Sequence, residues 1–147
     1  MAPPPRKHRG RGCEAVIART VLAGLALVLC AASAPRAQLP GVQRQVLERA
    51  AGPVDGQEVL LVRVEIAPGA ATGRHSHPGI ETGYVVAGEV VMQVDGEAPR
   101  TLVPGDSYLI PAGRIHDVRV VGGRPARALA TFVVERGKPL ATPAAPR

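Results

Sequence analysis

The sequence GAATGRHSHPGIETGYVVAG spans residues 69–88 and contains His75 and His77, two of the four histidines in the 147-residue chain. In an extended strand, residues i and i+2 point to the same face, so both imidazoles can point toward one centre. The Pro-Gly dipeptide after His77 favours a bend, which would let the carboxylate of Glu81 approach the same centre. The stretch therefore predicts a strand with two converging imidazoles and a carboxylate nearby.

A third histidine lies in a second stretch, GDSYLIPAGRIH, at residues 105–116. The turn sequence Pro-Ala-Gly-Arg precedes His116 and could deliver a later strand next to the first. A single histidine is more often a core or surface residue than a ligand. Three histidines and a glutamate in this arrangement instead favour a site for a divalent transition metal.

These two stretches resemble the two conserved motifs of the cupin superfamily, and the resemblance covers residues 59–134. The second motif differs at its end, where Val120 stands in place of the family's usual asparagine. That asparagine is not a metal ligand in the family, so the difference concerns only a pocket contact. The matching positions, at the family's spacing, are Gly69, His75, His77, Glu81, Gly88, Gly105, Pro111, Gly113 and His116.

The resemblance implies that a divalent metal (Fe, Mn, Ni, Cu or Zn) is bound by His75, His77, Glu81 and His116. Such a donor set leaves coordination positions open for a small-molecule ligand. One expected function is metal-centred catalysis of the oxygenase (dioxygenase-like) or isomerase type on a small oxygenated molecule. The alternative is a non-catalytic module that binds a sugar or an organic acid through the metal. A purely structural metal is a third, lesser interpretation.

Three further residues, Tyr84, Tyr108 and Arg114, are lesser catalytic candidates as proton donors or anion contacts. Packing of the tyrosines and solvation of the arginine are the more ordinary explanations. The scarcity of acid and base groups favours metal-centred chemistry or plain binding over hydrolysis. The other acidic residues near the motifs are expected on outward positions or in turns: Glu89, Asp95, Glu97, Asp106 and Asp117.

Residues 1–37 have the order of a secretory signal peptide, with a basic opening, an apolar run at 21–30 and then small residues. We expect cleavage after Ala37, with a cut after Ala34 as the alternative. The mature protein would then be periplasmic or secreted, without stable membrane association. An uncleaved anchor helix is the other interpretation. Both cysteines lie in this segment, so the mature chain would contain no disulfide.

The charge of the chain is concentrated in the same segment. Residues 1–37 hold six of the 18 Lys and Arg residues and one of the 12 acidic residues, which leaves 12 basic and 11 acidic side chains in the remainder. A nearly neutral remainder gives no electrostatic basis for binding nucleic acid. We therefore expect no nucleic-acid partner, although the net charge of the whole chain is +6.

The remaining sequence is expected to form an N-terminal arm at 38–57, a barrel at 58–136 and a proline-rich C-terminal tail at 137–147. The tail would lie over the surface or be disordered. Residues 43–49 fit either a short strand or a helical turn. The resemblance suggests that such an arm adds a strand to a partner subunit, which predicts a homodimer.

Hydrophobic alternation with a period of two marks short strands separated by Gly and Pro, and no amphipathic helix is apparent. This pattern predicts an all-β sandwich or barrel. The resemblance narrows it to a double-stranded β-helix, a jelly-roll barrel that forms a single cupin domain. The expected strands lie at residues 60–66, 89–94, 107–110, 116–120 and 128–135.

Overall fold

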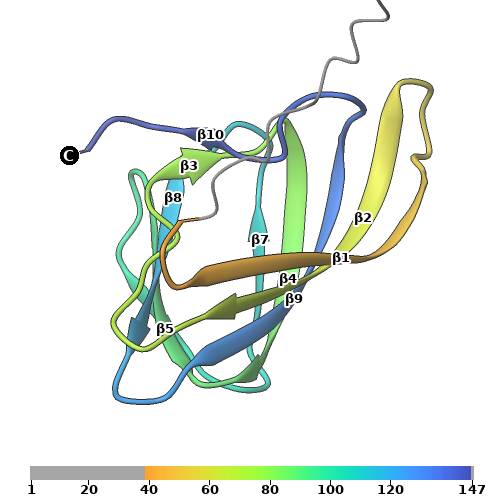
Figure 1. Cartoon of the computed structure of the whole chain (residues 1–147). Coiled ribbons are helices and arrows are strands. Elements are labelled where there is room, and N and C mark those ends of the chain that lie inside the picture. Colours follow the sequence, from red (N-terminus) through yellow and green to blue (C-terminus); the bar gives the residue numbers. More distant parts are fainter. Residues whose placement is uncertain (1–38, 147) are drawn as a thin grey trace, which may run out of the picture. The chain divides into compact units, whose positions relative to one another are not determined.

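The computed structural model describes residues 39–146 and contains ten strands in two five-stranded sheets (Figure 1). The predicted signal peptide lies outside the described residues. No helix long and apolar enough to cross a membrane occurs within residues 39–146. In order across the first sheet, the strands are β1 (Val42–Ala51), β2 (Gln57–Ile66), β9 (Ala126–Glu135), β4 (Gly79–Ala87) and β7 (Ser107–Ile110). Across the second sheet they are β10 (Thr142–Pro143), β3 (His75–Ser76), β8 (His116–Val121), β5 (Glu89–Val94) and β6 (Arg100–Leu102).

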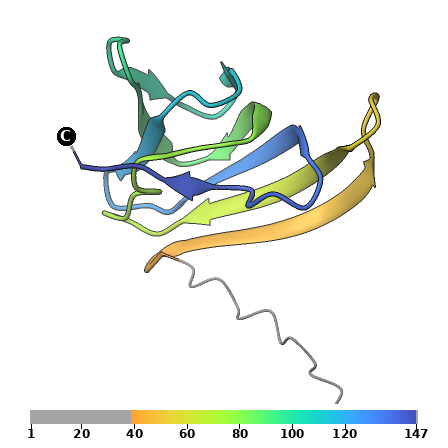
Figure 2. The ribbon, with the colours of Figure 1, turned by 90° about the horizontal axis from the view of Figure 1, so that it is seen from above.

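Every strand pair is antiparallel, and the chain alternates between the two sheets as it proceeds from β2 to β5 and from β6 to β9. The view from above shows the two sheets facing each other, with β1 at the outer edge beside β2 (Figure 2). This winding is the double-stranded β-helix, so the predicted all-β jelly-roll barrel is confirmed.

The core lies between the sheets and is built from the inward positions of the alternating strands. In β2, the even-numbered residues from 58 to 66 are all buried, as the period of two predicts. Phe132 is the single aromatic residue among the buried hydrophobic side chains of the described chain. Aliphatic packing of short strands thus forms a rigid frame around the inner face of the barrel.

The segment that fitted either a strand or a helical turn is a strand. β1 pairs with β2 along its whole length, with Val42 opposite Ile66 and Arg44 opposite Val64, and a bulge between Val46 and Glu48. Pairing with a complete neighbouring strand satisfies the backbone groups on one side of the arm, whereas a short isolated helix is only marginally stable.

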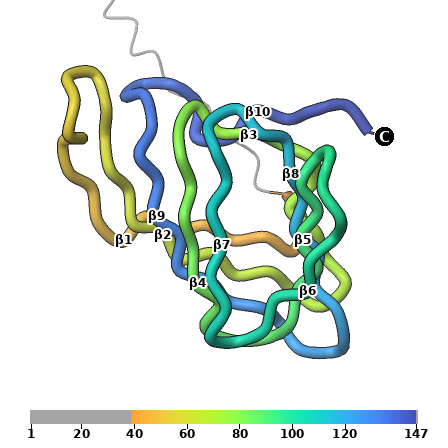
Figure 3. Tube along the Cα trace, turned by 180° about the vertical axis from the view of Figure 1, so that it is seen from behind, coloured from red at the N-terminus to blue at the C-terminus, as the bar shows by residue number. Residues whose placement is uncertain are grey.

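The C-terminal segment lies over the barrel, which was the first of the two expectations, and it adds a short strand. β10 pairs with β3 through Thr142 opposite Ser76 and Pro143 opposite His75, and Leu140 packs against the core. Seen from behind, β6 lies beside β5 and β7 beside β4, and the C-terminal segment passes over the end of the barrel near β3 (Figure 3). The C-terminal segment therefore closes one end of the barrel beside His75 and His77.

β4 and β9 approach each other unusually closely at the start of β4. A Cβ atom built on Gly79 would lie 2.0 Å from the carbonyl oxygen of Val133 and 2.6 Å from the Cα of Val134. Both are backbone atoms of the neighbouring strand, which a rotamer change cannot move. Only glycine fits at this position.

Candidate metal centre

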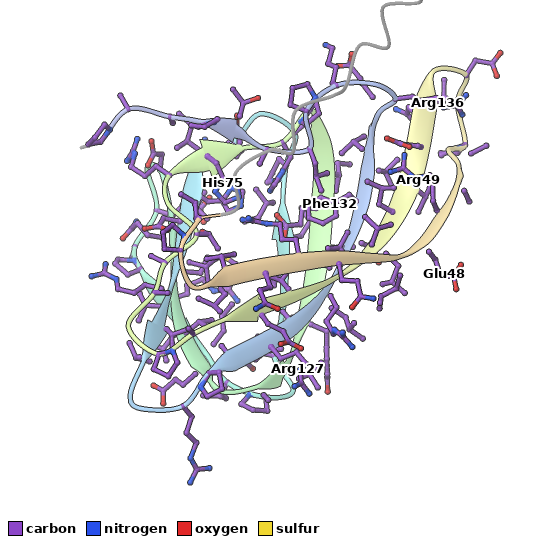
Figure 4. All side chains as sticks on the ribbon, in the orientation of Figure 1. Glu48, Arg49, His75, Arg127, Phe132 and Arg136 are labelled. Carbon is purple, nitrogen blue, oxygen red and sulfur yellow. The ribbon has the colours of Figure 1, made fainter. Side chains whose placement is uncertain are left out.

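Two neighbouring strands, β3 and β8, bring the predicted histidines together. His75 on β3 is directly opposite His116 on β8, and His77 follows β3 on the same face as His75. The ring centroids of the three imidazoles lie 4.4–5.1 Å apart. Figure 4 shows the side chains of His75, on β3, and Phe132, on β9, in the interior between the two sheets.

The glutamate reaches this cluster from the other sheet. Glu81 lies on β4, between Ile110 of β7 and Phe132 of β9. Its Oε2 atom is 2.9 Å from Nε2 of His77 and 3.4 Å from Nε2 of His116. One candidate ligand atom from each of the three histidines lies within 4.8 Å of the others. All four side chains are at least 94% buried, so bulk water has little access to them.

The hydrogen bonds of the imidazoles determine which nitrogen atoms face the centre. Each Nδ1 atom lies next to a backbone carbonyl oxygen, which only accepts hydrogen bonds, so Nδ1 carries the proton. In a neutral imidazole the lone pair is then on Nε2. The acceptors are Gly73 O for His75 (2.7 Å), Leu140 O for His77 (2.5 Å) and Arg114 O for His116 (3.1 Å).

Two of the converging atoms lack a hydrogen-bond partner of acceptable geometry within the described part of the chain: Nε2 of His77 and Oε2 of Glu81. Their separation of 2.9 Å does not make them partners, because both present lone pairs. Buried polar atoms left unpaired are costly and rare. A cation at the centre would satisfy them together, so this donor set fits a divalent metal.

The local electrostatics affect the protonation of two of the candidate ligands, His75 and Glu81. Burial lowers the pKa of His75 to about 4, since the charged imidazolium is poorly solvated there. Burial alone would raise the pKa of Glu81, but hydrogen bonds and positive charge from protonated His116 and His77 would lower it by more, and a cation bound between the same atoms would act in the same direction. At neutral pH we therefore expect a neutral His75 and an ionised Glu81.

A cavity of about 40 Å³ lies next to the cluster, between the two sheets. This volume accommodates a few water molecules or a small organic molecule. Apolar side chains form most of its wall, and the ring of Phe132 packs at 4.9 Å against that of His77. The polar and charged side chains of its wall, besides the four candidate ligands, are Arg44, Thr72, Tyr108 and Arg127.

Of the lesser catalytic candidates, the structure brings only Tyr108 to the cluster. Its hydroxyl donates a hydrogen bond to Oε1 of Glu81 at 3.0 Å. Burial, followed by the nearby Glu81 carboxylate, raises the pKa of Tyr108, so the hydroxyl stays protonated. Tyr84 is 51% exposed, on the outer side of β4. The guanidinium of Arg114 is turned outward, where it donates to the carbonyl of Asp95 (2.7 Å) and to Glu97 (3.3 Å).

The expected outward acids do not contribute to the cavity wall. Asp95 forms a two-point ion pair with Arg74, at 2.9 and 2.7 Å. Asp117 accepts a hydrogen bond from Thr72, whose side chain lines the cavity. Glu89, Glu97 and Asp106 are absent from that wall among the described residues.

Two contributions to the site were missed in the sequence. One is Arg44 of β1, which the alternation of Val42, Arg44 and Val46 would have placed inward if the arm had been assigned as a strand. The other is the backbone carbonyl of Leu140, which no sequence pattern identifies because every residue has one.

Substituting Tyr108→Phe should weaken metal binding by about 10-fold, since hydrogen-bond partners of ligands typically contribute 10- to 100-fold. The phenyl ring retains the packing but no longer holds Oε1 of Glu81. Competition with a chelator of known affinity would measure the change. Tyr84→Phe removes an exposed hydroxyl and serves as the control. Equal affinities of the two variants would contradict a role of Tyr108 in holding Glu81.

Deleting residues 139–147 should lower metal affinity by about 10- to 100-fold, because His77 would lose the carbonyl that fixes its orientation. Deletion of residues 146–147 alone retains Leu140 and β10, so it provides the matched control. Isothermal titration of the metal-free proteins with Zn²⁺ would compare them. An unchanged affinity in the longer deletion would show that His77 is oriented without the tail.

Comparison with known proteins gives a consistent result. The Cupin domain family matches residues 62–132. Germin-like protein 3-8 of Oryza sativa subsp. japonica is 37% identical over 79 residues, which cover 50% of this chain and 35% of the relative. Dimethylsulfoniopropionate lyase DddQ of Ruegeria pomeroyi is 33% identical over 78 residues, which cover 53% of this chain and 38% of the relative. The chain thus spans well under half the length of these relatives.

A similar structure is that of KdgF from Halomonas sp., with a TM-score of 0.56 and 26% sequence identity. The likeness covers 67% of this chain and 84% of that chain. The family match at residues 62–132 includes the strands that carry the cluster.

Proposed function

We propose that the described barrel, which has the fold of a cupin domain and matches the Cupin domain family over residues 62–132, holds a divalent transition metal on His75, His77, Glu81 and His116 and acts on a small oxygenated molecule. The observation that carries the proposal is the convergence of Nε2 lone pairs on a buried carboxylate oxygen, with two of these atoms left without hydrogen-bond partners. Imidazole and carboxylate donors suit Fe, Mn, Ni, Cu or Zn better than Mg or Ca.

The chain's own residues would prepare the site for such a metal. Three backbone carbonyls set the orientation of the imidazoles, and Tyr108 holds the second oxygen of Glu81. Phe132 and the aliphatic wall keep bulk water from the donors. A bound metal would supply Lewis-acid polarisation of a coordinated oxygen or activation of dioxygen.

Catalysis of the oxygenase or isomerase type is the favoured function. The name of DddQ specifies a lyase, which supports an enzymatic role in a related barrel but does not transfer its substrate to this chain. The tyrosine closest to the donors is already engaged with Glu81, so proton transfer by the protein is restricted. Chemistry centred on the metal would need no additional base.

A metal-dependent binding module is the second candidate, and one observation favours it. Within residues 39–146, the cavity wall contains no histidine, aspartate or glutamate beyond the four proposed ligands. A protein that only holds a sugar or an organic acid needs no such group. Turnover of any substrate would decide against this alternative.

The remaining expectations stay predictions. Periplasmic or secreted localisation depends on residues 1–37, which the structure does not describe. A homodimer through β1 is compatible with the position of that strand at the edge of its sheet, because an edge strand presents unpaired backbone groups.

Elemental analysis of the protein purified without added metal or chelator tests the proposed function first. We expect a transition metal near one equivalent per chain, followed by oxygen uptake with one member of a panel of catechols, flavonols, diketones and sugar acids. Stoichiometric metal without oxygen uptake would favour an isomerase or a binding module. Absence of metal, and no uptake of Zn²⁺ by the metal-free chain, would refute the proposed centre.

A further inference from the structure

Arg44 is an inward-facing cation at the edge of the first sheet. In the antiparallel pair of β1 and β2 it lies opposite Val64, and side chains of directly opposed residues share a face of the sheet. Val64 is buried in the core. Arg44 therefore extends into the barrel, where it lines the cavity together with His75, Glu81 and Tyr108.

The guanidinium of Arg44 has no direct partner in the described residues, since no hydrogen bond or ion pair within residues 39–146 involves it. Glu81 and Tyr108 influence it only through longer-range attraction, and burial lowers the pKa of Arg44 more than they raise it. Six other arginines of the described residues have direct partners, and the three without one, Arg100, Arg119 and Arg124, are exposed. Figure 4 shows Arg49, Arg127 and Arg136 away from His75. These partnered arginines are Arg49, Arg63, Arg74, Arg114, Arg127 and Arg136.

A half-buried guanidinium without a partner suits an anionic ligand. Its planar fork of donors matches the two oxygens of a carboxylate. The hydroxyl of Tyr108, which lines the same cavity, already donates its hydrogen bond to Glu81. The small cavity volume limits such a ligand to a few heavy atoms.

We propose that Arg44 binds the carboxylate of a small organic acid, whose neighbouring oxygen faces the three histidines. The inference rests on the proposed function, and it narrows the ligand class. An arginine at this position would favour small acids with a hydroxyl or oxo group next to the carboxylate over catechols, neutral diketones and sugars. Arg44 would thus make the site specific for negatively charged ligands.

Glycolate and glycolamide provide a matched pair of probes, because they have nearly the same shape and differ in charge. Titrations would use Co²⁺-loaded protein, with the visible absorption of the cobalt as the readout, in wild type, Arg44→Gln and Arg44→Lys. We expect wild type to prefer glycolate. Arg44→Gln should weaken glycolate binding by about 10- to 100-fold, the range for hydrogen bonds to charged groups, and leave glycolamide binding unchanged.

Arg44→Lys should retain part of the preference, because it keeps the charge and loses the fork. Arg63→Gln is the control for loss of a positive charge, since Arg63 lies on the neighbouring strand β2 and bonds to Gln45. Thermal melting and metal content of each variant establish that fold and metal site are intact. Arg44 could instead serve only to protect the sheet edge from pairing with another chain. In that case Arg44→Gln would change the association state of the protein and leave its glycolate affinity as in wild type.

Equal glycolate affinity of wild type and Arg44→Gln would overturn the proposal, as would equal losses for glycolate and glycolamide or no binding of glycolate by metal-loaded wild type. Failure of the proposed function appears in another measurement, as a wild type that takes up no Co²⁺. In that case, nuclear magnetic resonance titration of the metal-free protein with glycolate decides. Glycolate binding to the metal-free wild type that is lost in Arg44→Gln would uphold the role of Arg44. Absence of glycolate binding to the metal-free wild type would overturn it.

Discussion

His75→Ala should remove most of the bound metal and lower metal affinity by at least about 100-fold, beyond the usual effect of losing a hydrogen-bond partner of a ligand. His75 contributes one of the three imidazoles that lie within 4.8 Å of one another, and alanine offers no donor atom in its place. Metal content by elemental analysis and Zn²⁺ titration of the metal-free protein would both report the loss.

Ser76→Ala is the matched control for this substitution. Ser76 is the next residue of β3, and it shares none of the hydrogen bonds of the cluster. We expect wild-type metal content in the control and an unchanged fold in both variants, as judged by circular dichroism. Wild-type metal content in His75→Ala would refute the assignment of this histidine.

Gly79→Ala should destabilise the barrel by about 3 kcal/mol, at the upper end of the usual range for overpacking. The added methyl group would lie 2.0 Å from the carbonyl oxygen of Val133, so β4 and β9 would have to separate. Because Gly79 lies between His77 and Glu81 in the sequence, we also expect weaker metal binding. Urea unfolding monitored by circular dichroism would measure the free energy of unfolding.

Gly123→Ala provides the comparison, because a Cβ at this position meets no atom within 4 Å. A change within about 0.5 kcal/mol is expected there, as for most surface substitutions. If both alanine variants unfolded at the same urea concentration, the close approach of β4 to β9 would not be essential to the fold.

The sequence was sufficient for much of the barrel because local signals and tertiary structure agree there. The inward positions of β2 and β5 alternate cleanly, and the glycine of the Asp-Gly pair at residue 96 has φ of +82°, as the predicted turn requires. The spacing of His75 and His77 also brought both side chains to one face. These features depend on neighbouring residues, so a single sequence reveals them.

The features that the sequence did not decide depend on distant partners. Val42 and Val46 are spaced to suit either a helical turn or a strand, and pairing with β2 selects the strand. β10 is only two residues long and exists because β3 offers it a free edge. The inward direction of Arg44 follows from the same register, so it could not be inferred before the arm was assigned.

The hydrogen bond from His77 to the carbonyl of Leu140 connects residues that are 63 positions apart. A nascent chain on the ribosome lacks this carbonyl until residue 140 has been added. The strands that precede it can begin to pair earlier, but the imidazole of His77 acquires its orientation only after Leu140 is available. Maturation of the metal centre should therefore follow the synthesis of residue 140, which separates the time at which the barrel begins to fold from the time at which a metal can first be held tightly.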